Sequence, residues 1–184
     1  METKKDIRKC IFSRREAAEE ELLHTASAAI FQKVCQTDQY RQAKAVYAYM
    51  DFRREVETRD FIRQAWKDGK KVAVPKVVGK DLVFYLLESF DQLESGYFGI
   101  EEPASGQVAE EEEALLIVPG VAFDVNRHRI GYGEGFYDRY LSRHPRHATI
   151  AVAFDFQVLD QVPSEETDIC PNLLITESRI YENQ

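Results

Sequence analysis

Three glycines alternate with larger residues at positions 131, 133 and 135, and a helix is predicted to begin directly after them. Glycine has no Cβ, so successive backbone N–H groups can turn toward one point, and a helix start adds unpaired donors and the positive end of its dipole. This pattern is typical of a phosphate-binding loop. A plain tight turn would use the same glycines. The segment also lacks the lysine and hydroxyl of a P-loop and the last glycine of the dinucleotide motif.

Charged residues flank this loop on both sides. Asp138 falls in the first turn of the predicted helix, where its carboxylate could hold Mg²⁺ or simply complement the dipole. A basic patch at residues 127–129 precedes the glycines. Near the N-terminus, Lys4 and Arg8 stand four apart on a predicted helix and share one face. They could bind one polyphosphate together, although on the sequence alone a solvated basic helix end is the preferred explanation.

The elements that must position these residues follow from hydrophobic periodicity. Apolar runs predict strands at residues 45–50, 71–75, 82–86, 115–118, 148–153 and 173–176, with Pro119-Gly120 ending the fourth. Helical spacing predicts one long amphipathic helix at residues 4–36, a second at 58–66, a third from 136 onward and a short turn at 155–159. Strands separated by helices imply crossovers, so a mainly parallel sheet is predicted.

Two further segments are candidates for ligand contacts. Glu55 lies in a loop that follows the predicted strand at 45–50, and ligands bind at such strand ends in open α/β sheets. Its carboxylate could accept paired hydrogen bonds from an amino-pyrimidine edge, or it could belong to an ordinary helix start. The long loop at residues 90–106 is a candidate lid or pocket wall. Its aromatic residues Tyr97 and Phe98 could equally pack into the core.

Composition narrows the class of protein. The 184 residues suit a single domain over 1–184, and a net charge of −8 argues against a nucleic-acid binder. The chain has no run long enough to span a membrane and no signal-peptide core, so we expect a cytoplasmic protein that acts on small molecules, as a monomer. The three cysteines, at 10, 35 and 170, fit a reducing compartment, and we interpret them as buried or incidental.

Two motifs make the chain recognisable. Pro119-Gly-Val-Ala-Phe-Asp124 and Arg129-Ile-Gly-Tyr-Gly-Glu-Gly-Phe-Tyr-Asp-Arg139 resemble the signature of the 5-formyltetrahydrofolate cyclo-ligase family, also called 5,10-methenyltetrahydrofolate synthetase. The resemblance covers nearly the whole chain. It implies a three-layer α/β sandwich with helices on both faces of the sheet. It also implies conversion of 5-formyltetrahydrofolate to 5,10-methenyltetrahydrofolate, with ATP as co-substrate, Mg²⁺ as cofactor, and a phosphorylated formyl group as intermediate.

The resemblance also assigns roles to residues. Catalytic roles fall to Arg129, Tyr137 and Asp138, and Mg²⁺ would be held by Asp138 and Asp168. The reduced folate would be bound by Met50, Glu55 and Tyr97. ATP would be bound by Lys4, Lys5, Arg8, Arg129, Gly131, Tyr132, Gly133, Glu134, Gly135, Phe136 and Tyr137.

Four positions depart from the family pattern. Glu134 stands where many members carry lysine, Phe136 where they carry tyrosine, Thr167 where they carry histidine, and Asn172 where a second aspartate is common. One cationic phosphate contact and one hydroxyl are therefore in doubt. The missing contact would then fall to Arg129, Arg139 or Lys76.

Two other functions remain open at this point. A sugar-phosphate isomerase or transferase would also use a glycine-rich anion loop in an α/β domain, but it would need a base close to that loop. The second is a non-catalytic protein that binds nucleotide or folate, an interpretation to which the residues at 134, 167 and 172 give weight.

Overall fold

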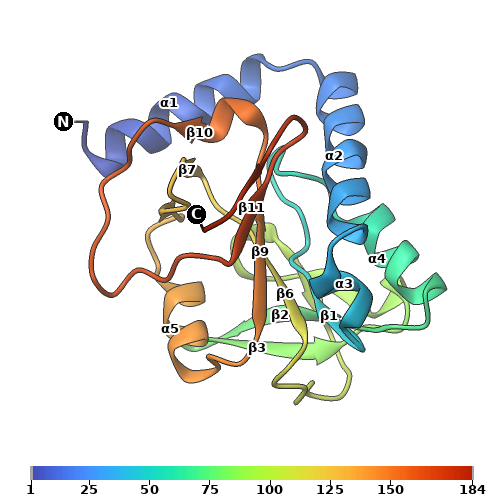
Figure 1. The fold of residues 1–184 in the computed structure, drawn as a ribbon. Coiled ribbons are helices and arrows are strands. Elements are labelled where there is room, and N and C mark those ends of the chain that lie inside the picture. The colour runs from blue at the N-terminus through green and yellow to red at the C-terminus, as the bar shows by residue number, and fades with distance from the viewer. Residues whose placement is uncertain (1, 184) are drawn as a thin grey trace.

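The structure is a computed structural model that describes residues 2–183, and its centre is a seven-stranded sheet (Figure 1). The strand order is β12-β11-β9-β6-β1-β2-β3. The strands are β1 (Ala45–Tyr47), β2 (Lys71–Val78), β3 (Asp81–Leu86), β6 (Leu115–Val118), β9 (Ala148–Val152), β11 (Leu173–Ile175) and β12 (Ile180–Tyr181). The five inner strands pair in parallel, and only the edge strands β3 and β12 are antiparallel. The prediction of a mainly parallel sheet is therefore confirmed.

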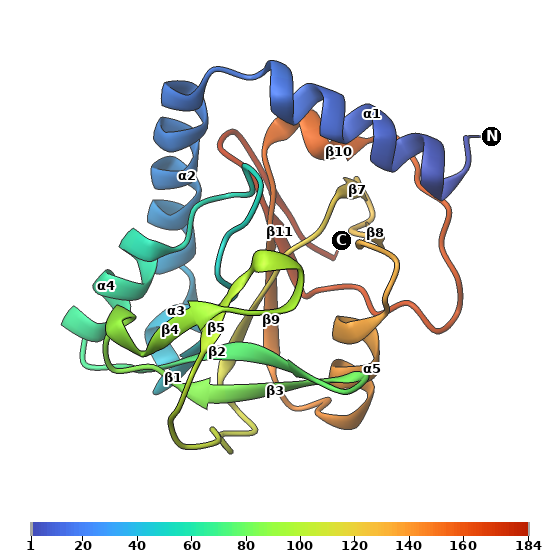
Figure 2. The same ribbon diagram turned by 180° about the vertical axis from the view of Figure 1, so that it is seen from behind.

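Helices cover both faces of this sheet. On one side lie α2 (Glu20–Cys35), α3 (Asp38–Gln42) and α4 (Arg59–Lys67), and on the other lies α5 (Phe136–Arg143), as Figures 1 and 2 show. Alternate residues of one strand face different layers, because side chains along a strand point to opposite faces. Leu115 packs in the core beneath α2 and α4, whereas Leu116 packs in the core beneath α5. The predicted three-layer α/β sandwich is thus confirmed.

The predicted single helix at residues 4–36 is wrong. The chain forms α1 (Lys4–Ala17), breaks at Ala18 in an extended conformation, and then begins α2. Arg54 stabilises the break, since its Nε donates to the carbonyl of Arg15 at 2.8 Å and its Nη2 donates to the carbonyl of Ala18. These carbonyls lie at the end of α1, where the carbonyl of Arg15 has only a 3.3 Å hydrogen bond from the N–H of Ala18. The break lets α1 cross the top of the molecule while α2 packs on the sheet (Figure 1).

Beneath α1 lies a small second sheet that the sequence did not predict. It consists of β7 (Ala122–Asp124), β8 (Arg129–Ile130) and β10 (Val158–Leu159). Ile7 and Ile11 of α1 pack on Ala122 and Ile130 of this sheet. These strands have two or three residues each, which is too short for a periodic signal. Their effect is to hold α1 beside the segment that follows β8.

The predicted loop at residues 90–106 is also more ordered than expected. It contains a hairpin of β4 (Leu93–Ser95) and β5 (Glu101–Pro103), with 3-10 turns η1 (Phe90–Gln92) and η2 (Tyr97–Gly99), and another such turn, η3 (Asp155–Gln157), follows β9. Figure 2 shows the hairpin beside β2. The cysteines are all free, and because Cys10 and Cys170 are exposed, the interpretation of these two as buried is wrong. Within residues 2–183, no helix combines the length and the apolar composition needed to span a bilayer.

Candidate functional site

The glycine loop connects β8 to α5 and presents unpaired backbone donors. Gly133 and Gly135 have φ angles of 107° and 68°, in the left-handed region that favours glycine. None of the N–H groups of residues 131–135 donates a hydrogen bond to another residue of the described range 2–183. Since unpaired N–H groups at a helix start attract anions, the loop has the donors that a phosphate group needs.

Helix α1 brings two predicted cations to this loop. Arg8 Nε donates to the carbonyl of Gly131 at 2.8 Å, and a Cβ added at Gly133 would lie 3.6 Å from Arg8 Nη2. One turn earlier, Lys4 Nζ lies 3.7 Å from Asp168 Oδ2. Lys5 is exposed at the same end of α1. The structure therefore places Arg8 against residues 131–133, although the two segments are more than 120 positions apart in the chain, and it places Lys4 beside Asp168.

Arg129 and Asp138 flank the loop at its two ends. The Arg129 side chain is only 8% exposed, its Nη2 lies 3.5 Å from Asp138 Oδ2, and its Nη1 donates to the carbonyl of Pro119 at 3.1 Å. Its guanidinium carbon lies 5.7 Å from the ring centre of Tyr137. Burial, followed by the charge of Glu55, raises the pKa of the Tyr137 hydroxyl well above its usual value of 10, so this hydroxyl stays protonated at neutral pH.

The two predicted metal ligands come from separate segments that meet at the start of α5. Asp138 Oδ1 accepts a hydrogen bond from the backbone N–H of Ile169 at 3.1 Å, which fixes the neighbouring Asp168 segment there. Asp168 Oδ2 in turn accepts from the N–H of Glu165 at 2.8 Å. No group of three or more His, Cys, Asp or Glu side chains suited to a metal occurs among residues 2–183. Proteins usually bind Mg²⁺ through one or two carboxylates, and water and phosphate oxygens complete the coordination. Two aspartates therefore fit this ion.

Glu55 is a buried carboxylate on the folate side of the predicted site. Its residue is 7% exposed, and its Oε1 accepts from the backbone N–H of Phe52 at 2.8 Å. Burial raises its pKa to about 7, against the opposing effects of Arg15, the Phe52 N–H and Tyr132. Met50, which precedes this loop, is buried at 3% exposure. The loop leaves the carboxyl end of β1, next to β6, whose own carboxyl end leads toward the glycine loop. Ligands bind at such neighbouring strand ends.

Tyr97 reaches the same region from the β4–β5 hairpin. Its ring meets the Phe136 ring edge-on, with 5.7 Å between centroids, and lies 4.6 Å from the Phe98 ring. Tyr97 and Phe98 are 38% and 70% exposed, so they are not core residues. The alternative that they pack into the core is therefore wrong. Phe136 opens α5, which means that the hairpin borders the glycine loop.

The predicted basic patch at 127–129 does not face the site as a whole. Arg127 has a positive φ of 69° and turns away, where its Nε donates to the carbonyl of Pro171 at 3.0 Å. His128 Nδ1 lies 2.9 Å from Asp124 Oδ2. Only Arg129 of the three points toward Asp138. Positions 127 and 129 would share a face in a regular strand, but the left-handed conformation of Arg127, which lies before β8 begins, turns its side chain away.

A functional candidate that the sequence analysis missed is Arg15. Its side chain is almost fully buried, with Nη1 donating to the Tyr132 hydroxyl at 2.9 Å and Nη2 to the carbonyl of Gly120 at 3.2 Å. A signal was present: Ile7, Ile11 and Arg15 repeat every four residues and form the buried face of α1. An arginine in line with buried isoleucines needs a polar partner inside the protein.

The four departures from the family pattern have different surroundings. Glu134 and Thr167 are exposed. Asn172 is structural, since its Oδ1 accepts from the N–H of Thr149 at 2.8 Å and ties the start of β9 to the approach of β11. Of the candidate replacement cations, Arg139 Nη1 donates to the Glu134 carbonyl at 2.7 Å, and Lys76 Nζ lies 4.0 Å from Glu102.

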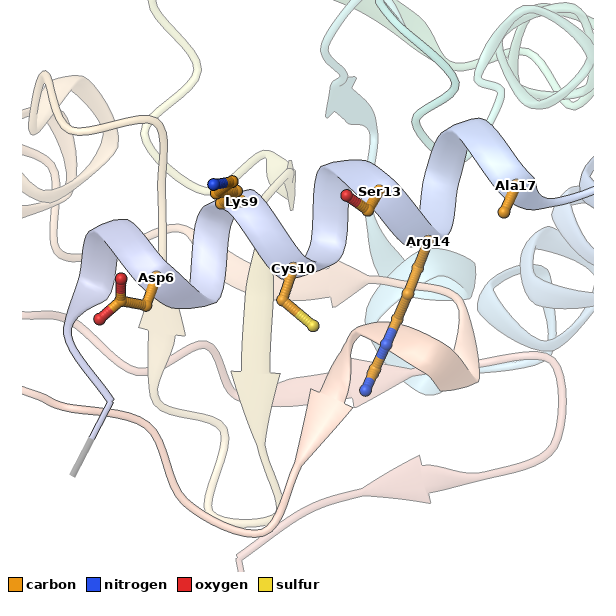
Figure 3. A pocket seen from close by; sticks show the side chains of 6 residues that line it. All are labelled: Asp6, Lys9, Cys10, Ser13, Arg14 and Ala17. Atoms are coloured by element: carbon orange, nitrogen blue, oxygen red, sulfur yellow. The ribbon is translucent and has the colours of Figure 1, made fainter.

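A hollow on the outer face of α1 is separate from these residues. Figure 3 shows its lining, which comes entirely from this helix: Asp6, Lys9, Cys10, Ser13, Arg14 and Ala17. A hollow lined by one helix is a shallow surface feature and encloses no ligand. The candidate site is therefore defined by the glycine loop and its neighbours.

Taken together, the sandwich and this loop define an α/β protein with unpaired N–H donors and cations at the carboxyl ends of its parallel strands, an arrangement suited to anionic ligands. The model of the 5-formyltetrahydrofolate cyclo-ligase family matches residues 1–177. The chain therefore belongs to this family of ligases, and the resemblance seen in its motifs is confirmed.

Individual relatives agree with this assignment. The mouse 5-formyltetrahydrofolate cyclo-ligase is 32% identical over 168 residues, which cover 83% of this chain and 82% of that protein. The Escherichia coli (strain K12) enzyme of the same name is 31% identical over 148 residues, covering 76% of this chain and 81% of that protein. The NMR structure of Aquifex aeolicus 5,10-methenyltetrahydrofolate synthetase superimposes with a TM-score of 0.86 at 31% identity and covers 97% of this chain and 92% of that one.

Proposed function

We propose that this protein is a ligase that converts 5-formyltetrahydrofolate to 5,10-methenyltetrahydrofolate, with Mg²⁺ as cofactor and with ATP as the phosphoryl donor, so that ADP and phosphate are released. The observation that carries the proposal is the set of unpaired N–H groups at residues 131–135, flanked by Arg8 and Arg129. Family membership supports the same conversion. It does not favour the sugar-phosphate isomerase or transferase that the loop alone left open.

The chemistry explains why a triphosphate is needed. The N5-formyl group is an amide, and closure of N10 onto its carbon would expel an oxide-like oxygen, which is a very poor leaving group. In the proposed reaction the formyl oxygen attacks the γ-phosphorus and ADP departs, which gives an imidate phosphate. N10 then attacks the formyl carbon and loses its proton, and the carbon–oxygen bond breaks to release phosphate. The product is the methenyl bridge, and no protein nucleophile is required.

On this proposal the nucleotide is held by positive charge and backbone donors. Lys4, Lys5 and Arg8 on α1, Arg129 after β8, and the loop N–H groups would bind phosphate oxygens and align the γ-phosphorus with the formyl oxygen. Asp138 and Asp168 would hold Mg²⁺, which when bound neutralises the phosphate charge. Tyr137 would line the boundary between the two ligands as a neutral hydroxyl.

The reduced folate would lie on the other side of this boundary. Glu55 would accept hydrogen bonds from the amino-pyrimidine edge of the pterin, Met50 would form an apolar wall, and Tyr97 would cover the ring from the hairpin. A carboxylate with two oxygens matches two adjacent N–H donors. The position of Glu55, buried and already bound by one N–H of Phe52, supports this role.

All of these residues come from one chain, which supports a monomer with a complete site. The strands of the main sheet extend from Ala45 to Tyr181, which supports a single domain over 1–184. The free cysteines support a reducing compartment, and we place the protein in the cytoplasm.

The direct test is to mix the purified protein with 5-formyltetrahydrofolate and Mg-ATP and to follow the methenyl chromophore. We expect Asp138→Asn to lower turnover by about 100-fold or more, while folate affinity stays within about 3-fold, because a metal-held charge acts on the transferring phosphate. Asp60→Asn is the matched control, since Asp60 also stands in the first turn of a helix but on the exposed surface. Folate binding without any chromophore would favour the non-catalytic alternative. Absence of folate binding would refute the proposed function.

A further inference from the structure

Tyr132 links the glycine loop to the interior of the protein. It lies between Gly131 and Gly133 and is 45% exposed, with its ring stacked on Phe12 at 6.0 Å between centroids. Its hydroxyl, however, points inward and accepts a hydrogen bond from Arg15 Nη1 at 2.9 Å. The conformation of the loop therefore decides whether the buried guanidinium of Arg15 keeps this partner.

Arg15 has few other partners. The residue is 2% exposed, and within residues 2–183 the only other hydrogen bond of its side chain goes from Nη2 to the carbonyl of Gly120 at 3.2 Å. Its Nε has no acceptor among the described residues 2–183. A buried charge in an incompletely satisfied network depends strongly on each remaining partner. Loss of the Tyr132 hydroxyl would leave the guanidinium with one hydrogen bond.

Both residues act on Glu55, the proposed folate anchor. The carbonyl of Arg15 accepts a hydrogen bond from Arg54 Nε at 2.8 Å, which ties α1 to the residue directly before Glu55. The positive charge of Arg15 lowers the pKa of Glu55, and the N–H of Phe52 and the hydroxyl of Tyr132 act in the same direction. Burial opposes them as the largest effect. The other groups that face this carboxylate are Asp51, whose charge raises its pKa, and the neutral hydroxyls of Tyr49 and Tyr137.

We propose that Arg15 and Tyr132 are positioning residues that couple the two ligand sites, so that nucleotide and reduced folate bind with positive cooperativity. This inference rests on the proposed function. When phosphate oxygens bind the N–H groups of the loop, they fix the Tyr132 hydroxyl against Arg15. Arg15 and Tyr132 then hold Glu55 in its ionised form, which accepts the N–H donors of the pterin. Coupling between two sites is reciprocal, so bound folate must tighten nucleotide binding by the same factor.

The test is the dissociation constant of 5-formyltetrahydrofolate, measured by calorimetry with and without a non-hydrolysable ATP analogue and Mg²⁺. Coupling of this kind spans about 5- to 150-fold, and we expect about 10-fold tighter folate binding in the presence of the analogue. We expect this factor to fall below about 2-fold in Tyr132→Phe and Arg15→Gln. Arg14→Gln is the control, because the neighbouring Arg14 is exposed and donates only to the carbonyl of Phe156. Arg14→Gln should keep the 10-fold gain in folate affinity that the analogue gives the wild-type protein.

A second readout separates positioning from simple loss of packing. Removal of either residue should move the midpoint of the pH profile of folate binding upward, since Glu55 would lose a group that lowers its pKa. A merely structural defect would weaken both ligands yet leave their ratio and the midpoint unchanged. Tyr132→Phe keeps the test valid if Arg15→Gln fails to fold, because it removes one hydroxyl from a half-exposed ring.

The outcomes distinguish this inference from the proposed function. If the wild-type protein binds both ligands but neither changes the affinity for the other, only the coupling is overturned. The same holds if Tyr132→Phe keeps the 10-fold gain in folate affinity and the wild-type midpoint of the pH profile. Wild-type protein that binds no folate refutes the proposed function and the coupling with it.

Discussion

Glu55→Gln should make the protein more stable at alkaline pH while it weakens folate binding. The carboxyl group is buried, and burial raises its pKa from the usual value of 4.5 to about 7. Because the folded-state pKa of this acid is the higher one, the unfolded chain releases the proton first, and stability falls as the pH rises between these two values. Above pH 7 the folded protein bears the full free-energy cost of burying the ionised carboxylate. The displacement of the pKa corresponds to about 3 kcal/mol of unfolding free energy at pH 8 and to less than about 1 kcal/mol at pH 5.

Glutamine retains the carbonyl oxygen that accepts from Phe52 but carries no charge to desolvate. Urea unfolding at pH 5 and pH 8 therefore measures the prediction directly. The expected gain for Glu55→Gln at pH 8 has an upper limit of about 3 kcal/mol, and the gain should nearly vanish at pH 5. Folate affinity at pH 8 should fall by about 10- to 100-fold, since a hydrogen bond to a charged acceptor contributes about 1.5–3 kcal/mol.

Glu57→Gln provides the matched control two residues away. Glu57 forms an exposed pair with His24, at 2.7 Å between Oε2 and Nδ1, and pairs this exposed to solvent contribute little to stability. This variant should leave folate binding unchanged and should be no more stable than the wild type at pH 8. Glu57 raises the pKa of His24, so the stability lost with Glu57 is lost at acidic pH, where His24 is charged. If Glu55→Gln were instead destabilised by equal amounts at both pH values, desolvation of a carboxylate would not be the main feature of this position, and the reasoning would be refuted.

Three further predictions follow from the site. Gly133→Ala should weaken binding of the ATP analogue by at least about 10-fold, because an alanine at a φ of 107° strains the loop by about 1–3 kcal/mol. The control is Gly69→Ala, at a φ of 79° beyond α4, which should lower only thermal stability. Removal of divalent cations with EDTA should abolish turnover, and added Mg²⁺ should restore it, whereas a rate that survives chelation would contradict the roles of Asp138 and Asp168. Tyr97→Ala should raise the dissociation constant of the folate by about 10-fold, since a stacked aromatic contributes about 1 kcal/mol beyond its buried area, and unchanged affinity would place the ring outside the folate site.

Features that depend on neighbouring residues could be predicted from the sequence. The apolar run at 115–118 became the fully buried β6, and the alternating glycines became a loop with unpaired donors before α5. Strand propensity, glycine conformation and helix starts are properties of a few consecutive residues. The strands with a clear apolar run and the helix at 58–66 were therefore located correctly, apart from their ends.

Contacts between distant segments escaped prediction for a physical reason. Nothing in residues 4–36 shows that Arg54 would take the carbonyls at the end of α1 and divide the predicted helix. Likewise, the basic run at 127–129 does not show that Arg127 turns away while Arg129 turns toward Asp138. Each outcome is decided by which carbonyls and carboxylates remain unpaired once the layers have packed.

The sequence by itself determined that a glycine loop with an adjacent carboxylate precedes a helix in a parallel α/β protein, because these are local preferences of the chain. Only the tertiary structure brought Arg15 of α1 to Tyr132 of the glycine loop and to Arg54 in the loop of Glu55, three segments with no common period or motif. Their apposition arises because the small sheet of β7, β8 and β10 seats α1 over the ends of the central strands. Packing of apolar faces thus decides where the charges meet.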